Sequence, residues 1–455
     1  MGRRPTTQFV CQECGARCPG WLGRCPECGG WGSLIEEALP TAASTAGSRG
    51  AVADILELSR IPEDDLRRLP TGMDVLDRVL GGGLVPGSAV LLAGEPGIGK
   101  STLLLQVADG LGKEARRVLY LSAEESGRQL RLRADRLGCE PAGLAVVADT
   151  SLEPVLEVLA TGDFSVVLVD SVQAVKSLDL QSPPGSISQV RHVANRLVEF
   201  CKHGETAVVM VGHITKDGAI AGPKSLEHLV DTVLSFEGDG AGEYRILRAT
   251  KNRFGPAGEV AMFEMHDAGL EPITDPSRVL VSRRREGAPG SAVTSSLQGL
   301  RPLLVEVQAL VHTTAFPSPR RMAVGCDANR LVLLVAVLER FAGVSFADKD
   351  IFVNVVGGLT LREPAADLAI CAALLSALLD RPLPSDAIFF GEVGLLGEVR
   401  PVSRVASRLS EAAHLGYDVA WAPTPPKAVD QTGLQVRHIS SLQELTSVVS
   451  GKPVD

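Results

Sequence analysis

The sequence predicts an α/β protein whose main domain is built on a mostly parallel β-sheet, preceded by a small cysteine-rich module and followed by a second α/β domain. Four short runs rich in β-branched residues alternate with amphipathic helical segments: Ala89–Gly94, Arg117–Ser122, Ser165–Asp170 and Thr206–His213. Strands that are apolar along their whole length lie in parallel sheets with helices on both faces. Two later runs, Asp231–Gly238 and Glu243–Asn252, mix polar and apolar residues and are predicted as antiparallel additions at the edge of this sheet.

Length and composition indicate several folded domains. A chain of 455 residues is too long for one core, and 45% apolar with 22% charged residues is typical of a globular protein. Changes in composition predict a cysteine-rich module at 1–32, a linker at 33–68, the main domain at 69–272, a linker at 273–300 and the second domain at 301–455. Neither a secretion signal nor an apolar run of roughly 18 residues is present, so we expect a cytoplasmic protein. The net charge of −9 gives no support for nucleic-acid binding, although a local basic stripe would be enough for it.

The first module carries two C-x-x-C pairs. Cys11 and Cys14 form the first pair, and Cys25 and Cys28 form the second after ten intervening residues. Two such pairs supply the four thiolates of a tetrahedral structural zinc site, and a segment of about 30 residues buries too little apolar surface to fold without one. Redox-active or incidental cysteines are the alternative, and Cys18 is a spare thiol that competes as a ligand.

The segment after the first apolar run matches the phosphate-binding pattern G-x-x-x-x-G-K-[ST]. Its residues are Gly94, Glu95, Pro96, Gly97, Ile98, Gly99, Lys100 and Ser101, and Thr102 follows in the predicted helix. In such a loop the backbone N–H groups surround the β-phosphate, the lysine reaches the β- and γ-phosphate oxygens, and the hydroxyl binds Mg²⁺. The sequence therefore predicts binding of ATP with Mg²⁺.

Carboxylates at two other strand ends extend this prediction to hydrolysis. Asp170 ends an apolar strand at the edge where ligands of parallel sheets bind, and it is the candidate that holds Mg²⁺. Glu124 and Glu125 follow another strand, where a carboxylate can orient the attacking water or cap the next helix. Spacing alone does not choose between these two roles.

Two further motifs are specific enough to suggest a family. Thr71–Asp74 followed by Leu80–Ser88 is similar to the lead-in to RecA-type ATPase cores, and Lys251–Gly255 reads KNRFG. Together with the four-cysteine module they resemble the bacterial DNA-repair family RadA, also called Sms, over essentially the whole chain. The resemblance implies a RecA-like phosphate-loop core, a zinc-ribbon-like module and a C-terminal domain like the proteolytic domain of Lon.

The resemblance also implies roles for individual residues. It selects Glu124 over Glu125 as the catalytic glutamate, and it makes Lys251 and Arg253 cations that reach the γ-phosphate of a neighbouring subunit. It places His213 where RecA-like proteins sense the γ-phosphate. A basic turn is the alternative for KNRFG, and a buried core histidine is the alternative for His213.

Two segments are DNA-binding candidates under the same resemblance, Val175–Arg191 and Ile214–Lys224. Both are polar and carry cations that can meet phosphates in the channel of a ring, and neither has an aromatic residue for base stacking. We expect both to be flexible, with ordinary solvated loops as the alternative.

The C-terminal domain resembles that of Lon without its catalytic residues. The serine nucleophile corresponds to Ala365, and the lysine base corresponds to Ala406. A methyl group neither attacks a carbonyl nor accepts a proton, so we expect a scaffold for ring assembly. A basic DNA-binding surface is a further expectation, with the candidates Arg320, Arg321, Arg330, Arg400, Arg404 and Arg408.

The resemblance as a whole implies an ATP hydrolase acting on DNA, a hexameric ring that uses ATP, Mg²⁺ and structural Zn²⁺. Its implied role is branch migration of recombination intermediates during DNA repair and recombination, in response to DNA damage and stress. The implied partners are single-stranded and branched DNA, further copies of the chain and the recombinase RecA, in the nucleoid region of the cytoplasm and away from membranes. Two alternatives stay open: an ATPase switch or clamp that does not translocate, and an ATP-dependent protease, which Ala365 and Ala406 oppose.

Overall fold

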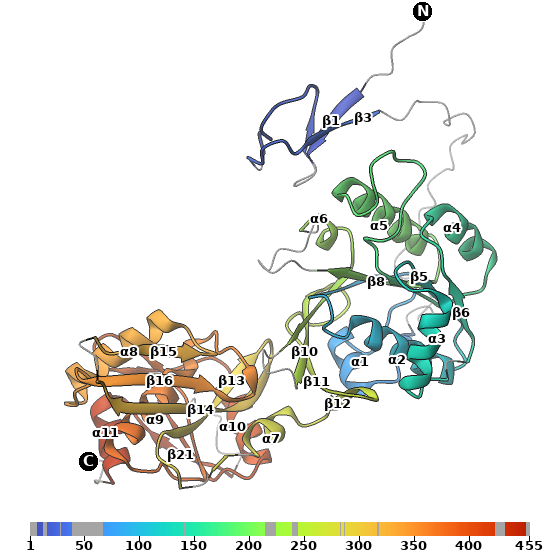
Figure 1. Cartoon of the computed structure of the whole chain (residues 1–455). Helices are drawn as coiled ribbons and strands as arrows, with labels where there is room; N and C mark the ends of the chain where they lie inside the picture. Colours follow the sequence, from blue (N-terminus) through green and yellow to red (C-terminus); the bar gives the residue numbers. More distant parts are fainter. Residues whose placement is uncertain are drawn as a thin grey trace, which may run out of the picture. The chain divides into compact units, whose positions relative to one another are not determined.

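The computed structural model describes residues 7–11, 16–27, 29–38, 67–140, 142–213, 224–238, 244–282, 284–285, 287–315, 318–423 and 433–451. Two compact units divide the chain, one of residues 1–237 and 245–272 and the other of residues 238–244 and 273–455 (Figure 1). Among the described residues no helix is long and apolar enough to cross a membrane.

The N-terminal module is a three-stranded antiparallel sheet. Its strand β1 (Thr7–Cys11) pairs with both β2 (Arg17–Cys18) and β3 (Leu34–Ala38). Strand β3 lies in the segment predicted as linker, so the folded module continues to Ala38. Leu34 explains this extension, because it is buried with the thiols of the module and β1 alone offers too little surface for a core.

The rest of the first unit is organised around a nine-stranded sheet in the order β12-β11-β10-β9-β4-β8-β7-β5-β6. Five strands run parallel to their neighbours: β4 (Ala89–Gly94), β8 (Ala207–His213), β7 (Val166–Asp170), β5 (Val118–Ser122) and β6 (Leu144–Val147). Strands β4, β5 and β7 are buried along their whole length, as the apolar runs predict. The mostly parallel α/β core is confirmed.

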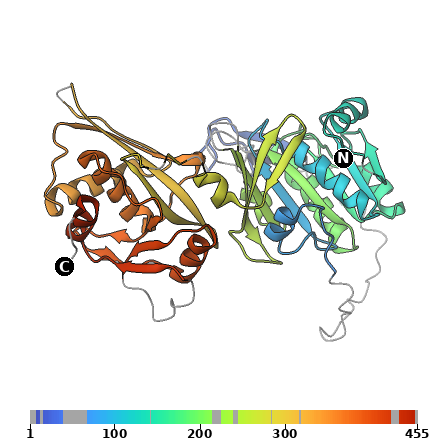
Figure 2. The same cartoon turned by 90° about the horizontal axis from the view of Figure 1, so that it is seen from below.

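Helices cover both faces of this sheet (Figures 1 and 2). One layer contains α1 (Asp74–Leu80), α2 (Lys100–Lys113) and α3 (Gly127–Arg136), and the other contains α4 (Leu152–Thr161), α5 (Ile187–Lys202) and the short α6 (Lys224–Glu227). Side chains along a strand alternate between faces, so Val90 and Leu92 belong to the first core whereas Leu91 and Ala93 belong to the second.

The prediction for β9 (Thr232–Gly238) is wrong. It was expected as an antiparallel edge strand, but it pairs in parallel with β4 and lies inside the sheet. Strands β10 (Tyr244–Asn252), β11 (Val260–His266) and β12 (Gly269–Ile273) continue the sheet outward. The polar positions Ser235 and Glu237 fall towards the more exposed end of β9. Polar residues in a strand indicate that one face of the sheet is partly exposed there. They do not indicate whether the strand runs parallel or antiparallel to its neighbour.

The second unit contains a seven-stranded mixed sheet in the order β15-β16-β14-β13-β17-β20-β21. Its strands are β13 (Ser291–Gln298), β14 (Arg301–Thr313), β15 (Arg321–Val324), β16 (Lys349–Val355), β17 (Ala387–Phe389), β20 (Val419–Ala422) and β21 (Gln435–His438). The helices are α7 (Pro276–Val281), α8 (Ala328–Phe341), α9 (Asp367–Leu379), α10 (Val405–His414) and α11 (Leu442–Ser450). A separate hairpin is formed by β18 (Glu392–Val393) and β19 (Val399–Arg400).

The linker predicted at 273–300 is instead folded. It contains α7 and β13, and β13 pairs with β14 on one side and β17 on the other, so the main part of the second unit begins at Ile273. The sequence of β13, SAVTSSLQ, is too polar to be recognised as a central strand, although Thr294, Ser295 and Ser296 are all buried.

Candidate functional site

The phosphate-binding loop joins β4 to the N-terminus of α2, and neighbouring strands press closely on it. A Cβ on Gly94 would lie 2.6 Å from the carbonyl oxygen of Phe236 in β9. Gly99 has a φ of 114°, which is strained for any other residue. Arg245 of β10 donates from Nε to the carbonyl of Ile98 at 3.0 Å. The loop is therefore shaped by β9 and β10 as well as by its own glycines.

Lys100 lies across this loop. Its Nζ donates to the carbonyl oxygens of Gly94 at 2.9 Å and Glu95 at 2.8 Å, and only 4% of the residue is exposed. Burial lowers the pKa of Lys100, while the negative charges of Asp170 and Glu124 act in the opposite direction. Both predicted carboxylates are thus close enough to interact electrostatically with the lysine.

Asp170 ends β7 at the same sheet edge and is 8% exposed. One carboxylate oxygen accepts a hydrogen bond of 2.8 Å from the hydroxyl of Tyr120 in β5. Burial raises the pKa of Tyr120, so this hydroxyl stays protonated and remains a donor. The second carboxylate oxygen and the hydroxyl of Ser101, in the first turn of α2, are oxygen donors of the kind that Mg²⁺ prefers. The residues present therefore fit this ion.

Glu124 and Glu125 have different surroundings. The Glu124 carboxylate accepts a hydrogen bond from the hydroxyl of Ser171 and lies 3.1 Å from Nε2 of His213. The hydrogen bond from His213, together with that from Ser171, lowers the pKa of Glu124 to about 2. Glu125 instead forms an ion pair with Arg133 of α3. This arrangement favours Glu124 as the residue that faces the phosphates.

His213 ends β8 and is not a core histidine. Its side chain is 31% exposed, and its Nε2 points to Glu124. The alternative of a buried core position is therefore wrong, because β8 emerges from the core at its last residue.

Sequence reasoning missed three residues that support this site: Tyr120, Ser171 and Arg245. A tyrosine within an otherwise apolar buried strand needs a hydrogen-bond partner, and this signal could have identified Tyr120. Ser171 directly follows Asp170, which is a weaker clue. Nothing in the sequence indicates that Arg245 contacts a loop 147 residues away.

Lys251 and Arg253 lie at the opposite end of the parallel strands, away from the phosphate loop. Arg253 pairs with Asp231 at 3.0 Å, and the other oxygen of Asp231 accepts from the backbone N–H of Ala89 at 3.1 Å. Ala89 is the first residue of β4, whereas the phosphate loop begins at the last, Gly94. At about 3.3 Å per residue, these two ends are roughly 16 Å apart. The two cations therefore do not reach the phosphate loop of their own subunit.

The KNRFG segment packs on the end of α1. Asn252 donates from Nδ2 to the carbonyl of Leu80 at 3.1 Å, and a Cβ on Gly81 would lie 3.0 Å from Cα of Gly255. Lys251 donates from Nζ to the carbonyl of Val230 at 2.7 Å. The two sequence motifs that suggested the family are thus neighbours in space.

The first DNA-binding candidate is more ordered than predicted. Residues from Ile187 onward belong to α5, so Arg191 is helical. Gln189 is buried and donates from Nε2 to the carbonyl oxygens of Ser177, Leu180 and Ser182 at 3.0–3.1 Å. These bonds hold the segment against α5, and the expectation of a flexible loop is wrong here. The second candidate lies outside the described residues except for Lys224, which begins α6.

Three thiols come together in the N-terminal module. Cys11, Cys18 and Cys25 are buried around Leu34, whereas Cys14 and Cys28 lie outside the described residues. Within the described part of the chain, no group of three or more His, Cys, Asp or Glu residues is arranged to hold a metal ion. The chemistry of the donor set, soft thiols in a module with a very small core, fits zinc.

The Lon-like positions are structural. Ala365 is buried just before α9, and Ala406 is exposed on α10. Arg408 is completely buried and forms a two-pronged ion pair with Glu363, with N–O distances of 2.9 and 2.6 Å.

The predicted basic surface is wrong for two of its members. Arg408 is buried, and Arg330 pairs with Asp367 and donates to the carbonyl of Val393. Arg400 pairs with Glu398, but its side chain is still 57% exposed. Sequence could not show the first two, because their acidic partners Glu363 and Asp367 lie 45 and 37 residues away.

Comparisons with known proteins cover all three parts of the chain. Family models match for an AAA domain over residues 56–219, a rubredoxin metal-binding domain over residues 9–36 and subunit ChlI of Mg-chelatase over residues 326–424. The DNA repair protein RadA of Pseudomonas aeruginosa is 46% identical over 441 residues, which are 96% of this chain and 97% of that protein. The DNA repair protein RadA of Aquifex aeolicus is 45% identical over 449 residues, which are 99% of this chain and 100% of that protein. The crystal structure of the KaiC-like protein PH0186 from Pyrococcus horikoshii aligns with 46% of this chain and 99% of its own, at 19% identity and a TM-score of 0.39. On the strength of the two full-length relatives, this chain belongs to the RadA family of DNA repair proteins.

Proposed function

We propose that this protein is an ATP-driven motor on DNA that works as a hexameric ring and drives branch migration of recombination intermediates. The observation that carries the proposal is the distance, within one subunit, between the phosphate loop and the two cations of the KNRFG segment. The phosphate loop with Asp170 and Glu124 lies at the end of β4 and β7, whereas Arg253 lies beside the start of β4, as does Lys251 two residues before it. In the proposal these are two halves of one ATPase site, and a neighbouring subunit brings them together.

In this proposal, the first half binds and activates the nucleotide. The loop N–H groups and Lys100 bind the β- and γ-phosphates, and Ser101 and Asp170 would hold Mg²⁺, which neutralises phosphate charge when bound. Glu124 orients the attacking water. A carboxylate has about four acceptor positions, so the hydrogen bonds from Ser171 and His213 leave room for that water while they fix the carboxylate.

The neighbouring subunit supplies the second half. The Arg253 side chain is 52% exposed even though it pairs with Asp231, so its guanidinium is accessible to a bound phosphate of another copy. Cations that reach the γ-phosphate from a partner raise the rate of other NTPases by roughly 10³–10⁵. A single subunit on its own is then expected to bind ATP and to hydrolyse it slowly.

DNA is the proposed substrate of the motor. The segment that Gln189 holds against α5, together with Ile214–Lys224, would face single-stranded DNA in the ring channel. The proposed partners are branched DNA and the recombinase RecA, and the proposed location is the nucleoid region of the cytoplasm.

The subunit-interface part is tested by mixing two variants, Lys100→Ala and Arg253→Ala. Each variant alone is expected to be inactive. In a mixed ring, the intact phosphate loop of one variant meets the intact arginine of the other, and random mixing restores up to about one quarter of the interfaces. A mixture as inactive as its components would contradict a site shared between subunits.

The motor itself is tested with ATPase rates in the presence and absence of single-stranded DNA, next to unwinding of a branched substrate and degradation of casein. DNA stimulation with unwinding is expected. DNA stimulation without unwinding would favour a clamp, and casein degradation would favour a protease.

A further inference from the structure

On one face of the sheet in the second unit, part of the surface has no helix over it among the described residues. Side chains along β14 alternate between the face under α9 and the opposite face. On that opposite face, Leu304 is buried in the core with α10, and this core contains no residue of β15 or β16. Leu310, on the same face of β14, is 61% exposed. It pairs across the strands with Phe352 of β16, which in turn pairs with Met322 of β15.

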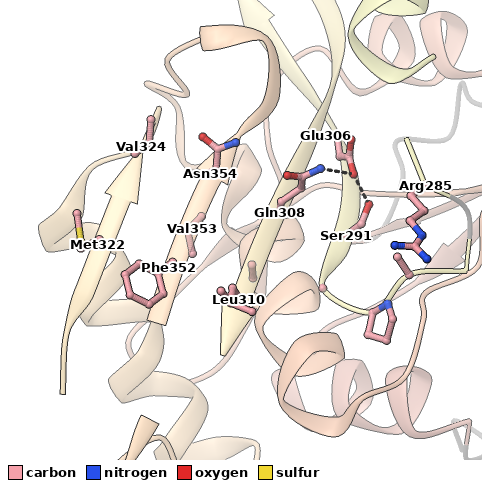
Figure 3. Close-up of a pocket in the computed structure, with 14 residues that line it drawn as sticks. Arg285, Ser291, Glu306, Gln308, Leu310, Met322, Val324, Phe352, Val353 and Asn354 are labelled. Atoms are coloured by element: carbon pink, nitrogen blue, oxygen red, sulfur yellow. Dashed lines mark hydrogen bonds between the residues drawn. The ribbon is translucent and has the colours of Figure 1, made fainter. Parts of the chain in front are cut away.

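These side chains line a hollow of about 540 Å³ (Figure 3). Met322 and Val324 are 54% and 57% exposed, which is unusual for such residues side by side on one strand. We call the surface formed by Leu310, Met322, Val324 and Phe352 the apolar groove. At one end, Glu306 is satisfied by hydrogen bonds from Ser291 at 2.6 Å and Gln308 at 3.2 Å, as Figure 3 shows.

An arginine borders the apolar groove. Arg285 lines the hollow, and no ion pair in the described part of the chain involves its guanidinium. Arg321 precedes Met322 on β15 but pairs with the buried Ile351, so its side chain leaves the other face of the sheet. The groove is therefore an apolar surface with positive charge beside it.

The same unit carries an apolar projection elsewhere. The tip of the β18–β19 hairpin is Gly394–Gly397, and its Leu395 and Leu396 are 63% and 77% exposed. Carboxylates flank the tip, because Glu392 lies before it and Glu398 after it. Glu398 already pairs with Arg400, and Glu392 is the acid that remains.

The hairpin is held firmly. Arg330 of α8 donates to the carbonyl of Val393 at 2.8 Å, and Asp367 of α9 accepts from its N–H at 3.2 Å. Gly397 has a φ of 81°, and a Cβ there would lie 2.7 Å from the ring of Phe341 at the end of α8. A tip fixed this rigidly presents its two leucines without a large entropic cost on binding.

We propose that the Leu395–Leu396 tip of one subunit inserts into the apolar groove of a second copy of this chain. Apolar side chains match apolar side chains, and Glu392 beside the tip matches Arg285 beside the groove. The tip is anchored on α8 and α9, whereas the groove is on the sheet face away from these helices, so the two do not meet within one chain. Such a head-to-tail contact repeats around a closed ring. This inference rests on the ring assembly proposed above and names the surfaces that form it.

The contact is tested by sedimentation velocity of the full-length protein with Mg²⁺ and a non-hydrolysable ATP analogue. Leu396→Glu places a charge on the apolar tip, and Met322→Glu places a charge in the apolar groove. Each variant is expected to lose the ring. Mixed together, the variants have one intact tip and one intact groove, so they are expected to form a heterodimer and nothing larger. The matched control is Leu132→Glu, at a leucine 63% exposed in the first unit, which is expected to keep the wild-type mass.

A second measurement does not depend on how the charged variants fold. A chain with both Leu396→Cys and Met322→Cys, treated with a short bis-maleimide, is expected to give covalent multimers. Each variant with only one of these added cysteines gives at most the background that the nine native cysteines give in the wild type. Rings of wild-type mass in Leu396→Glu, or the absence of double-cysteine crosslinks, would overturn the contact. A wild-type chain that stays a single subunit overturns the ring and the contact together. A wild-type ring without DNA-stimulated ATPase refutes the motor and leaves the contact standing.

Discussion

Replacing Glu124 tests whether its position beside Lys100 and Asp170 has the chemical role that its surroundings indicate. Glu124→Gln keeps the size of the side chain and removes its charge. We expect kcat for ATP to fall by roughly 10²–10⁴, or about 3–5 kcal/mol of barrier, with little change in KM. Glu125→Gln is the matched control. It breaks an ion pair with Arg133 in which both side chains are partly exposed (27% and 29%), so we expect a cost below about 1 kcal/mol and an ATPase rate close to wild type.

The low pKa of the Glu124 carboxyl follows from its hydrogen bonds. Its pKa is lowered from 4.5 to about 2, chiefly by His213. At about 1.4 kcal/mol per pKa unit the full shift would be worth ~3 kcal/mol, but the side chain is 46% exposed, and solvent screening reduces this to ~1 kcal/mol. A depressed pKa stabilises the fold above pH 4.5, and this stabilisation disappears as the pH falls through about 2.

His213→Ala should therefore lower the free energy of unfolding by ~1 kcal/mol at pH 7, with no difference from the wild type near pH 2. Urea titrations at both pH values measure this. The pKa of Glu124 should also rise towards 4.5, which adds an acid limb to the pH profile of kcat/KM. Equal stability of the two proteins at pH 7, or a Glu125→Gln variant as inactive as Glu124→Gln, would refute the reasoning.

Three more predictions concern packing and metal binding. Gly110→Ala, which would stabilise a free helix by about 1 kcal/mol, should here lower the thermal midpoint, because the new Cβ would lie 2.1 Å from the carbonyl oxygen of Thr71; an unchanged midpoint would show that this contact relaxes easily. Glu363→Ala leaves Arg408 buried without its carboxylate, and urea unfolding should show a loss of about 3–5 kcal/mol, whereas a loss under 1 kcal/mol would mean that the guanidinium reaches water. Cys25→Ser should remove zinc from the purified protein by metal analysis, and retention of one zinc per chain would exclude Cys25 as a ligand.

Local features were the easiest to predict. The strand before Gly94 is apolar, the glycines permit unusual backbone angles, and Lys100 opens a helix, so neighbouring residues alone specify the phosphate loop. Helix α8 is also specified by neighbouring residues, since its apolar residues recur with helical spacing over 14 positions.

Features that depend on distant partners were predicted poorly. Strand β13 looks like a linker until β14 and β17 pair with it, because only the sheet accounts for a buried run of Thr and Ser. Arg408 reads as a surface cation until Glu363, 45 residues earlier, is placed beside it. The direction of β9 depends on its pairing with β4 and on nothing in its own residues.

By itself, the sequence determined that the chain has a nucleotide-binding α/β core, a thiol-rich module and a family relationship, because each of these is carried by residues close together or by motifs matched one at a time. Only the tertiary structure decided that Glu124 lies near Lys100, that His213 and Ser171 hold its carboxylate, and that Arg253 lies beside the start of β4, away from the phosphate loop. The physical reason is that hydrogen bonds and charges act over a few ångströms in space. Residues 47 to 142 positions apart become partners only when parallel strands bring their ends together.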